Sequence, residues 1–145
     1  MLTKTYVPKV SKQDEVKWFL FDAEGQVLGK LATEISKFLI GKNSPEFSYH
    51  LIPRVRVLVI NAAKIRVTGA KLEQKKYYRH SHYPGNLKEK NLAEMIQENP
   101  TKVLFLAVKG MLPKNKLRKH YLLNLHIEAG SEHDKQAQEM TSVQI

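Results

Sequence analysis

The sequence predicts a single α/β domain with a polar extension at each end. Some segments place apolar residues at helical spacing, while others are short, β-branched and almost continuously apolar. The 145 residues are enough for one domain with a sizeable core, and no repeat, linker or low-complexity stretch divides them. We therefore expect an extension over residues 1–16, the domain over residues 17–130 and a polar tail over residues 131–145.

The first half of the chain predicts two strands around one helix. The apolar run at 18–21 predicts a strand followed by a turn, and the β-branched run at 55–60 predicts a strand covered on both faces. Between them, Gly41 is placed to end a helix and Pro45 to prevent its continuation. The apolar face of this helix comprises Leu28, Leu31, Ile35, Phe38 and Leu39.

The second half predicts shorter elements. Residues 65–67 alternate like a short strand, and residues 75–81 fit either a strand or an extended loop before turn residues at 83–86. Asn91 and Glu94 form a capping-box pattern that opens a short helix, and Pro100 begins another. The buried face of this second helix is expected to comprise Val103, Leu104, Ala107, Val108 and Met111. Segment 114–119 should be helical and 125–129 the last strand.

These elements predict a core and two loose ends. The residues expected to be buried are Leu28, Leu31, Ile35, Val57, Val59, Val103 and Val108. Residues 1–14 and 139–145 lack an apolar pattern and are expected to be mobile in the isolated protein.

The positive charge is concentrated in the middle of the chain. Residues 63–121 hold 14 Lys/Arg and 4 Asp/Glu, a net charge of +10, which equals that of the whole protein. A positive electrostatic field concentrated in this way attracts polyanions. Nucleic acid is the favoured partner on this basis, and an anionic membrane is the second. The chain has no cysteine, which excludes disulfides and thiolate chemistry. With no apolar run long enough for a bilayer and no secretory leader pattern, cytoplasm is the default expectation.

Two basic clusters are the candidate RNA-binding sites. In the first, cations alternate with rings that offer stacking platforms for unpaired bases, although a strand with inward tyrosines and solvated cations is the plainer alternative. Its candidates are Lys71, Lys75, Lys76, Tyr78, Arg79, His80, Ser81 and His82. In the second, a helix with Lys114, Arg118 and Tyr121 on one face would present that face to a backbone groove. Its candidates are Lys109, Lys114, Asn115, Lys116, Arg118 and Lys119.

Enzymatic patterns are weak, and we expect no catalytic residue, metal or cofactor. His80 and His82 could share one side of a strand, but nothing nearby supplies a third metal ligand. Residues 41–44 resemble the end of a phosphate-binding loop, yet Ser36 stands where that loop requires glycine. Asp22 and Glu24 lack an acid/base partner at a recognisable spacing.

Four segments of the chain resemble one family, the bacterial-type thirteenth protein of the large ribosomal subunit. The matching segments are residues 18–32, residues 60–72, residues 75–81 with 83–85, and residues 107–117, in family order. The resemblance covers about residues 18–138 and is most specific at 107–117. It implies a three-layer α/β/α domain on a small mixed sheet that binds large-subunit ribosomal RNA directly and supports subunit assembly. The chain departs from the family pattern at 51–55, at His82 and Asn86, at 118–119 and at 132–136. The resemblance therefore does not predict the conformations of the loops at 50–54, 82–86 and 118.

The expected function is therefore a structural constituent of the large ribosomal subunit. The expected partners are large-subunit ribosomal RNA and neighbouring ribosomal proteins, with no membrane and no small-molecule substrate. Its place would be the cytoplasmic ribosome, with an organellar ribosome left open. One alternative is an extra-ribosomal regulator that binds RNA or protein, and another is a phosphate-substrate enzyme using residues 41–44 and 80–82.

Overall fold

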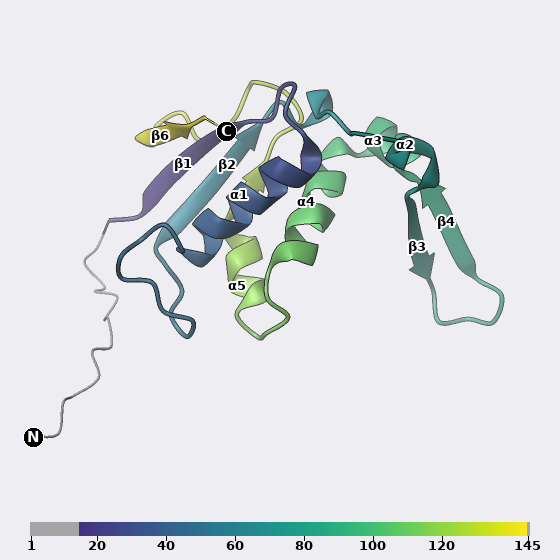
Figure 1. The fold of residues 1–145 in the computed structure, drawn as a ribbon, viewed down its shortest axis with the longest axis horizontal. Coiled ribbons are helices and arrows are strands. Elements are labelled where there is room, and N and C mark those ends of the chain that lie inside the picture. Colours follow the sequence, from purple (N-terminus) through teal and green to yellow (C-terminus); the bar gives the residue numbers. More distant parts are fainter. Residues whose placement is uncertain (1–14, 145) are drawn as a thin grey trace, which may run out of the picture.

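The computed structural model describes residues 15–144 and contains one parallel sheet with helices packed on it (Figure 1). The strands lie in the order β5–β2–β1–β6, and each neighbouring pair is parallel. They are β1 (Lys17–Asp22), β2 (Val55–Ile60), β5 (Leu125–Ile127) and β6 (Met140–Val143). The α/β class is confirmed, and antiparallel pairing is confined to a separate hairpin, β3 (Lys76–His80) with β4 (Leu87–Asn91).

Two longer helices end and begin as the sequence predicts. Gly41 follows α1 (Leu28–Ile40) in the left-handed region at φ 83°, and its N–H donates to the carbonyls of Lys37 and Phe38. Pro100 occupies the first turn of α4 (Pro100–Met111), where its missing N–H costs no helical hydrogen bond. The capping box of Asn91 and Glu94 opens α3 (Leu92–Glu98). The shorter helices are η1 (Ala62–Lys64), α2 (Lys71–Gln74) and α5 (Arg118–Leu123).

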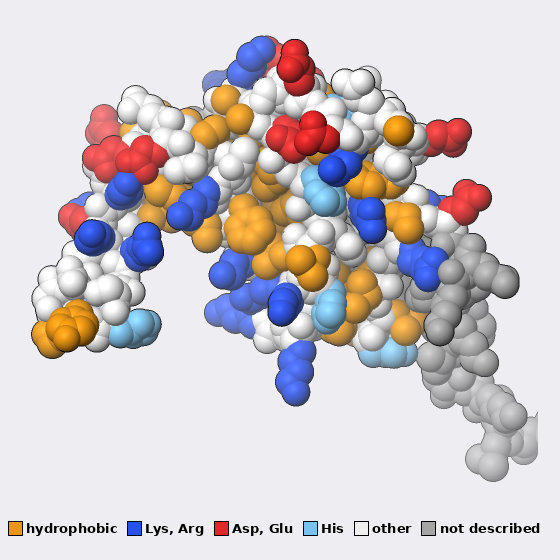
Figure 2. Space-filling model, turned by 180° about the vertical axis from the view of Figure 1, so that it is seen from behind, with side chains coloured by type: hydrophobic (Ala, Val, Ile, Leu, Met, Phe, Trp, Pro, Cys, Tyr) orange, Lys and Arg blue, Asp and Glu red, His pale blue; other side chains and the backbone are white. Residues whose placement is uncertain are grey.

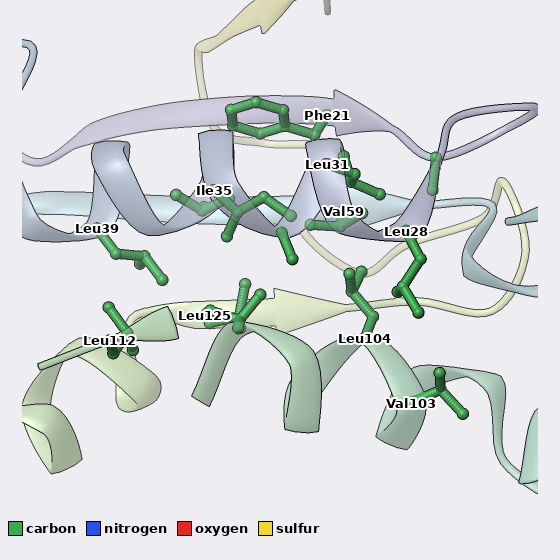
Figure 3. Packing of buried hydrophobic residues seen from close by; sticks show 14 of the residues in the cluster. Phe21, Leu28, Leu31, Ile35, Leu39, Val59, Val103, Leu104, Leu112 and Leu125 are labelled. Atoms are coloured by element: carbon green, nitrogen blue, oxygen red, sulfur yellow. The ribbon is translucent and has the colours of Figure 1, made fainter. Parts of the chain in front are cut away.

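The main core lies between the sheet, α1 and α4. Figure 3 shows Leu31 and Ile35 of α1 beside Phe21 and Val59 of the sheet, with Leu104 of α4 below them. All seven residues predicted to be buried are buried, which confirms the helical spacing and the central strand. Met111 is an exception among the residues predicted for the buried face of α4. Its side chain is 44% exposed at the last position of α4, where its Sδ accepts a hydrogen bond from Thr33 Oγ1 at 3.4 Å.

The sheet face opposite α1 and α4 is also covered. Trp18 is 5% exposed and stacks on His126, and Arg56 lies 5.2 Å from the centre of the indole ring. Right-handed crossovers are the rule between parallel strands, and a right-handed one from β5 to β6 would carry the connection 128–139 over this second face. Lys135 lies close enough to His126 to help lower its pKa, after the larger effect of burial.

Three predicted elements differ from the structure. Residues 65–67 form a single bridge, Arg66 to Val27, because Arg66 ties the loop to the start of α1 rather than to the sheet. Segment 114–119 is mostly turn, and helix begins only at Arg118. The prediction that residues 139–145 are mobile is wrong for residues 140–143, which form β6 beside β1. Residues 1–14, the subject of the other mobility prediction, lie outside the described residues.

Candidate nucleic-acid interface

The first basic cluster lies on α2 and on a hairpin that projects from the body (Figure 1). Segment 76–80 is a strand, which decides between the two predicted conformations. Of its two tyrosines, Tyr77 packs against the core while Tyr78 is 63% exposed, so the alternative with both rings inward is wrong. Ser81 and His82 lie exposed in the connection between β3 and β4.

The turn of this hairpin has an unusual backbone. His82 has φ 64°, in the left-handed region where a side chain is disfavoured and where the resembled family usually has glycine. Its N–H donates to Nδ1 of His80 at 2.9 Å. The two imidazoles are 5.8 Å apart between ring centroids, and no third His, Asp or Glu within residues 15–144 completes a metal site with them.

Members of the two basic clusters line two separate grooves, and α4 contributes to both of them. A groove of about 600 Å³ is lined by Lys71 and Lys75 on one side and by Gly110 and Met111, at the end of α4, on the other. A second groove, of about 530 Å³, begins at the adjacent Lys109 and is lined further along by Lys116, Arg118 and Lys119. Lys71 and Lys75 therefore lie near the end of α4, although they precede it by more than 30 residues in the sequence. In Figure 2, Lys and Arg side chains line the underside of the body and the hairpin, with a hollow between them.

Most of these cations have no acidic partner. Within residues 15–144, Glu89 lies 3.1 Å from Lys76 and raises the pKa of that lysine, mainly through the hydrogen bond between them. Lys75 lies 5.3 Å from the ring centre of Tyr77. The predicted cations that form no ion pair with another residue of the described range 15–144 are Lys71, Lys75, Arg79, Lys109, Lys114, Lys116, Arg118 and Lys119. Unneutralised cations held together repel one another, so an anion bound among them is favoured.

Arg118 and Asn115 hold the α4–α5 loop together. Arg118 donates from Nε to the carbonyl of Pro113 at 3.1 Å and from Nη2 to that of Leu112 at 3.4 Å. Asn115 Oδ1 accepts the N–H of Arg118 at 3.1 Å, at the start of α5. The predicted exposed face of Lys114, Arg118 and Tyr121 is wrong, because Tyr121 is 1% exposed and its burial raises the pKa of its hydroxyl.

The carboxylates of the first turn are engaged in structural contacts. Asp22 accepts hydrogen bonds from Asn61 Nδ2 at 2.9 Å and from the N–H of Glu24 at 3.0 Å. These bonds, the one from Asn61 first, lower the pKa of Asp22. Glu24 pairs with Lys64 at 2.8 Å. Both carboxylates therefore fix the loops at the carboxyl ends of β1 and β2.

Two cations of the hairpin were missed by sequence reasoning. Lys88 and Lys90 lie on β4, directly opposite Arg79 and Tyr77. The turn residues at 83–86, directly after a possible strand, were the available signal for a second strand, because short Gly-containing turns join hairpins.

The chain matches one protein family over most of its length. The family model for ribosomal protein L13 matches residues 16–134. The chain belongs to the ribosomal protein L13 family. "Large ribosomal subunit protein uL13" of Syntrophus aciditrophicus is 51% identical over 93% of this chain and 94% of its own length. The protein of that name from Aquifex aeolicus is 49% identical over 98% of both chains, and that from Listeria welshimeri is 46% identical over 93% and 92%.

Membership of this family makes the chain a structural ribosomal protein and not an enzyme. The resemblance first noted in four segments is thereby confirmed across nearly the whole chain. No helix within residues 15–144 is long and apolar enough to cross a membrane.

Proposed function

We propose that this chain is a structural constituent of the large subunit of the cytoplasmic ribosome that binds ribosomal RNA through the two basic clusters. Family membership supports the ribosomal role, and the relatives carry the name of a large-subunit protein. The observation that carries the RNA-binding role is that cations of both clusters line grooves beside α4, with few acidic partners within residues 15–144. Neighbouring ribosomal proteins are further partners, in keeping with the family.

The residues of this surface divide by role. Phosphates would be neutralised by the exposed cations that have no ion pair within the described part of the chain: Lys71, Lys75, Arg79, Lys88, Lys109, Lys114, Lys116 and Lys119. Asn115 and Arg118 would position the loop that carries Lys114 and Lys116. Tyr78, His80, Ser81 and His82 would contact the RNA from the hairpin. Lys76 contributes less because Glu89 offsets its charge.

A salt titration tests this proposal. Each phosphate neutralised adds about 0.7–0.9 to the slope of log affinity against log salt, so six to ten contacts give a slope of several units. Filter binding of large-subunit RNA fragments should show that slope, and Lys116→Met should reduce it by roughly 0.7–0.9. Lys17→Met removes the same charge at the start of β1, far from the hairpin, and should leave affinity and slope unchanged. A wild-type slope near zero would refute the electrostatic interface.

Assembly in cells gives a second, independent readout. Tagged protein should sediment with large subunits on a sucrose gradient and stay there after a moderate salt wash. Recovery only in the free pool would contradict a constitutive ribosomal role.

A further inference from the structure

The two faces of the β3–β4 hairpin carry different chemistry. In an antiparallel ladder, directly opposite residues lie on the same face, and the face alternates along each strand. The register therefore groups Tyr77, Arg79, Lys88 and Lys90 on one side, here called the cationic face. The other side, the ring face, comprises Lys76, Tyr78, His80, Leu87, Glu89 and Asn91.

Phosphate binding accounts for the cationic face. Tyr77 packs against the core, and Lys90 pairs with Glu98 of α3 at 2.5 Å, so this face turns toward the body. Arg79 and Lys88 lie further out on the same face, directly opposite each other and without an acidic partner within residues 15–144. Like charges in this position destabilise a strand pair. A phosphate held between them removes that repulsion.

Phosphate binding does not account for the ring face. Its one cation, Lys76, is offset by Glu89 at 3.1 Å, so the face has little net charge. Tyr78 is 63% exposed and Leu87 is 60% exposed, and Tyr83 in the connecting turn is 74% exposed. Eight large apolar side chains are exposed within residues 15–144, and this short hairpin supplies three of them. Such a concentration of exposed apolar surface marks an interaction site.

We propose that the ring face binds unpaired nucleobases, with Tyr78 as the principal stacking platform and His80 beside it. This inference rests on the proposed RNA-binding function and assigns the part of the RNA that this face recognises. Tyr78 and His80 occupy alternate positions of β3, which places same-face residues about 7 Å apart along a strand. Stacked bases repeat at about 3.4 Å, so one base fits between two rings at that spacing.

The surroundings favour a nucleic acid over a protein as the occupant. The ring face offers two rings and one leucine, an area suited to one or two flat bases. The cationic face of the same hairpin provides phosphate contacts for the chain that carries those bases. Stacking on aromatic rings is how proteins bind unpaired RNA, whereas the stacked bases of a duplex are not available to them.

Binding of matched RNA probes tests the proposal. The probes are a ten-nucleotide oligouridine and a fully paired RNA duplex of the same length, titrated with wild-type protein and three variants. Tyr78→Leu should weaken oligouridine binding by about ten-fold, with the salt slope unchanged and duplex binding unaffected. Tyr78→Phe, which keeps the ring, should bind as the wild type does. Tyr49→Leu removes a tyrosine that is 76% exposed outside the hairpin and should also bind normally.

Separate outcomes distinguish this inference from the proposed function. Equal loss on both probes, or no loss with Tyr78→Leu, would overturn base stacking. Normal binding to both probes combined with failure of Tyr78→Leu to enter large subunits would also overturn it, by indicating a protein partner. If wild-type protein binds neither probe and no large-subunit RNA fragment, the proposed function itself fails. Circular dichroism of each variant verifies folding, which an exposed side chain should not perturb.

Discussion

Replacing Arg118 by methionine separates positioning of the α4–α5 loop from contact with RNA. The guanidinium makes two hydrogen bonds to backbone carbonyls, at 3.1 Å to Pro113 and at 3.4 Å to Leu112. Charge-assisted hydrogen bonds each contribute about 1.5–3 kcal/mol net. The longer bond is weak at that distance, and the half-buried site leaves water to compete for the freed carbonyls. We therefore expect Arg118→Met to lower the free energy of unfolding by about 2 kcal/mol.

Chemical denaturation of the isolated protein measures this effect, with Lys116→Met as the matched control. Lys116 lines the same groove but is exposed and makes no ion pair with residues 15–144, so its replacement should change stability by less than about 0.5 kcal/mol. The salt slope of RNA binding should rank the two variants the other way. Lys116→Met should lower the slope, while Arg118→Met should lower the affinity with a smaller change in slope.

Arg118→Lys refines the comparison. Lysine keeps the charge but lacks the fork that reaches two carbonyls, so about half of the 2 kcal/mol should be lost. If Arg118→Met leaves stability unchanged and lowers the salt slope as much as Lys116→Met does, Arg118 contacts phosphate and the positioning role is wrong.

Three further predictions concern the fold and its pH dependence. Leu31→Ala should cost about 2–5 kcal/mol in denaturant unfolding, since Leu31 is fully buried between α1 and the sheet. His82→Gly should stabilise the protein by about 1 kcal/mol by relieving the left-handed backbone at φ 64°, and a loss of stability would show that the His82 side chain matters more than its strain. The pKa of His126 in the folded protein is lowered, mainly by burial. The contribution of His126 to the free energy of unfolding should therefore be fully present above its unfolded pKa of about 6.5 and should decline as the pH falls through its folded pKa. Comparing the pH dependence of unfolding with that of His126→Phe measures this, and identical curves would contradict it.

Sequence predicted α1, α3, α4 and the central strand because their signals are local. Gly41 ends α1 through its own backbone, and Leu28 to Leu39 mark a face that any neighbouring layer would bury. Strand β6 escaped prediction because residues 140–143 carry no apolar pattern; they are ordered by hydrogen bonds to β1, more than 100 residues earlier. The exposure of Met111 likewise depends on where α4 ends relative to α1.

The sequence predicted which residues belong to the site but not how they are arranged in space. Charge and rings identified both clusters, but they could not separate Arg118, which bonds to its own loop, from Lys116, which does not. Nor could they divide the hairpin, because its faces follow from the register of Arg79 against Lys88 across a turn. That register converts a run of alternating cations and rings into two surfaces, one suited to phosphates and one to bases. A chain of the same composition shifted by a single residue would place Arg79 opposite Leu87 or Glu89 and would lose both surfaces.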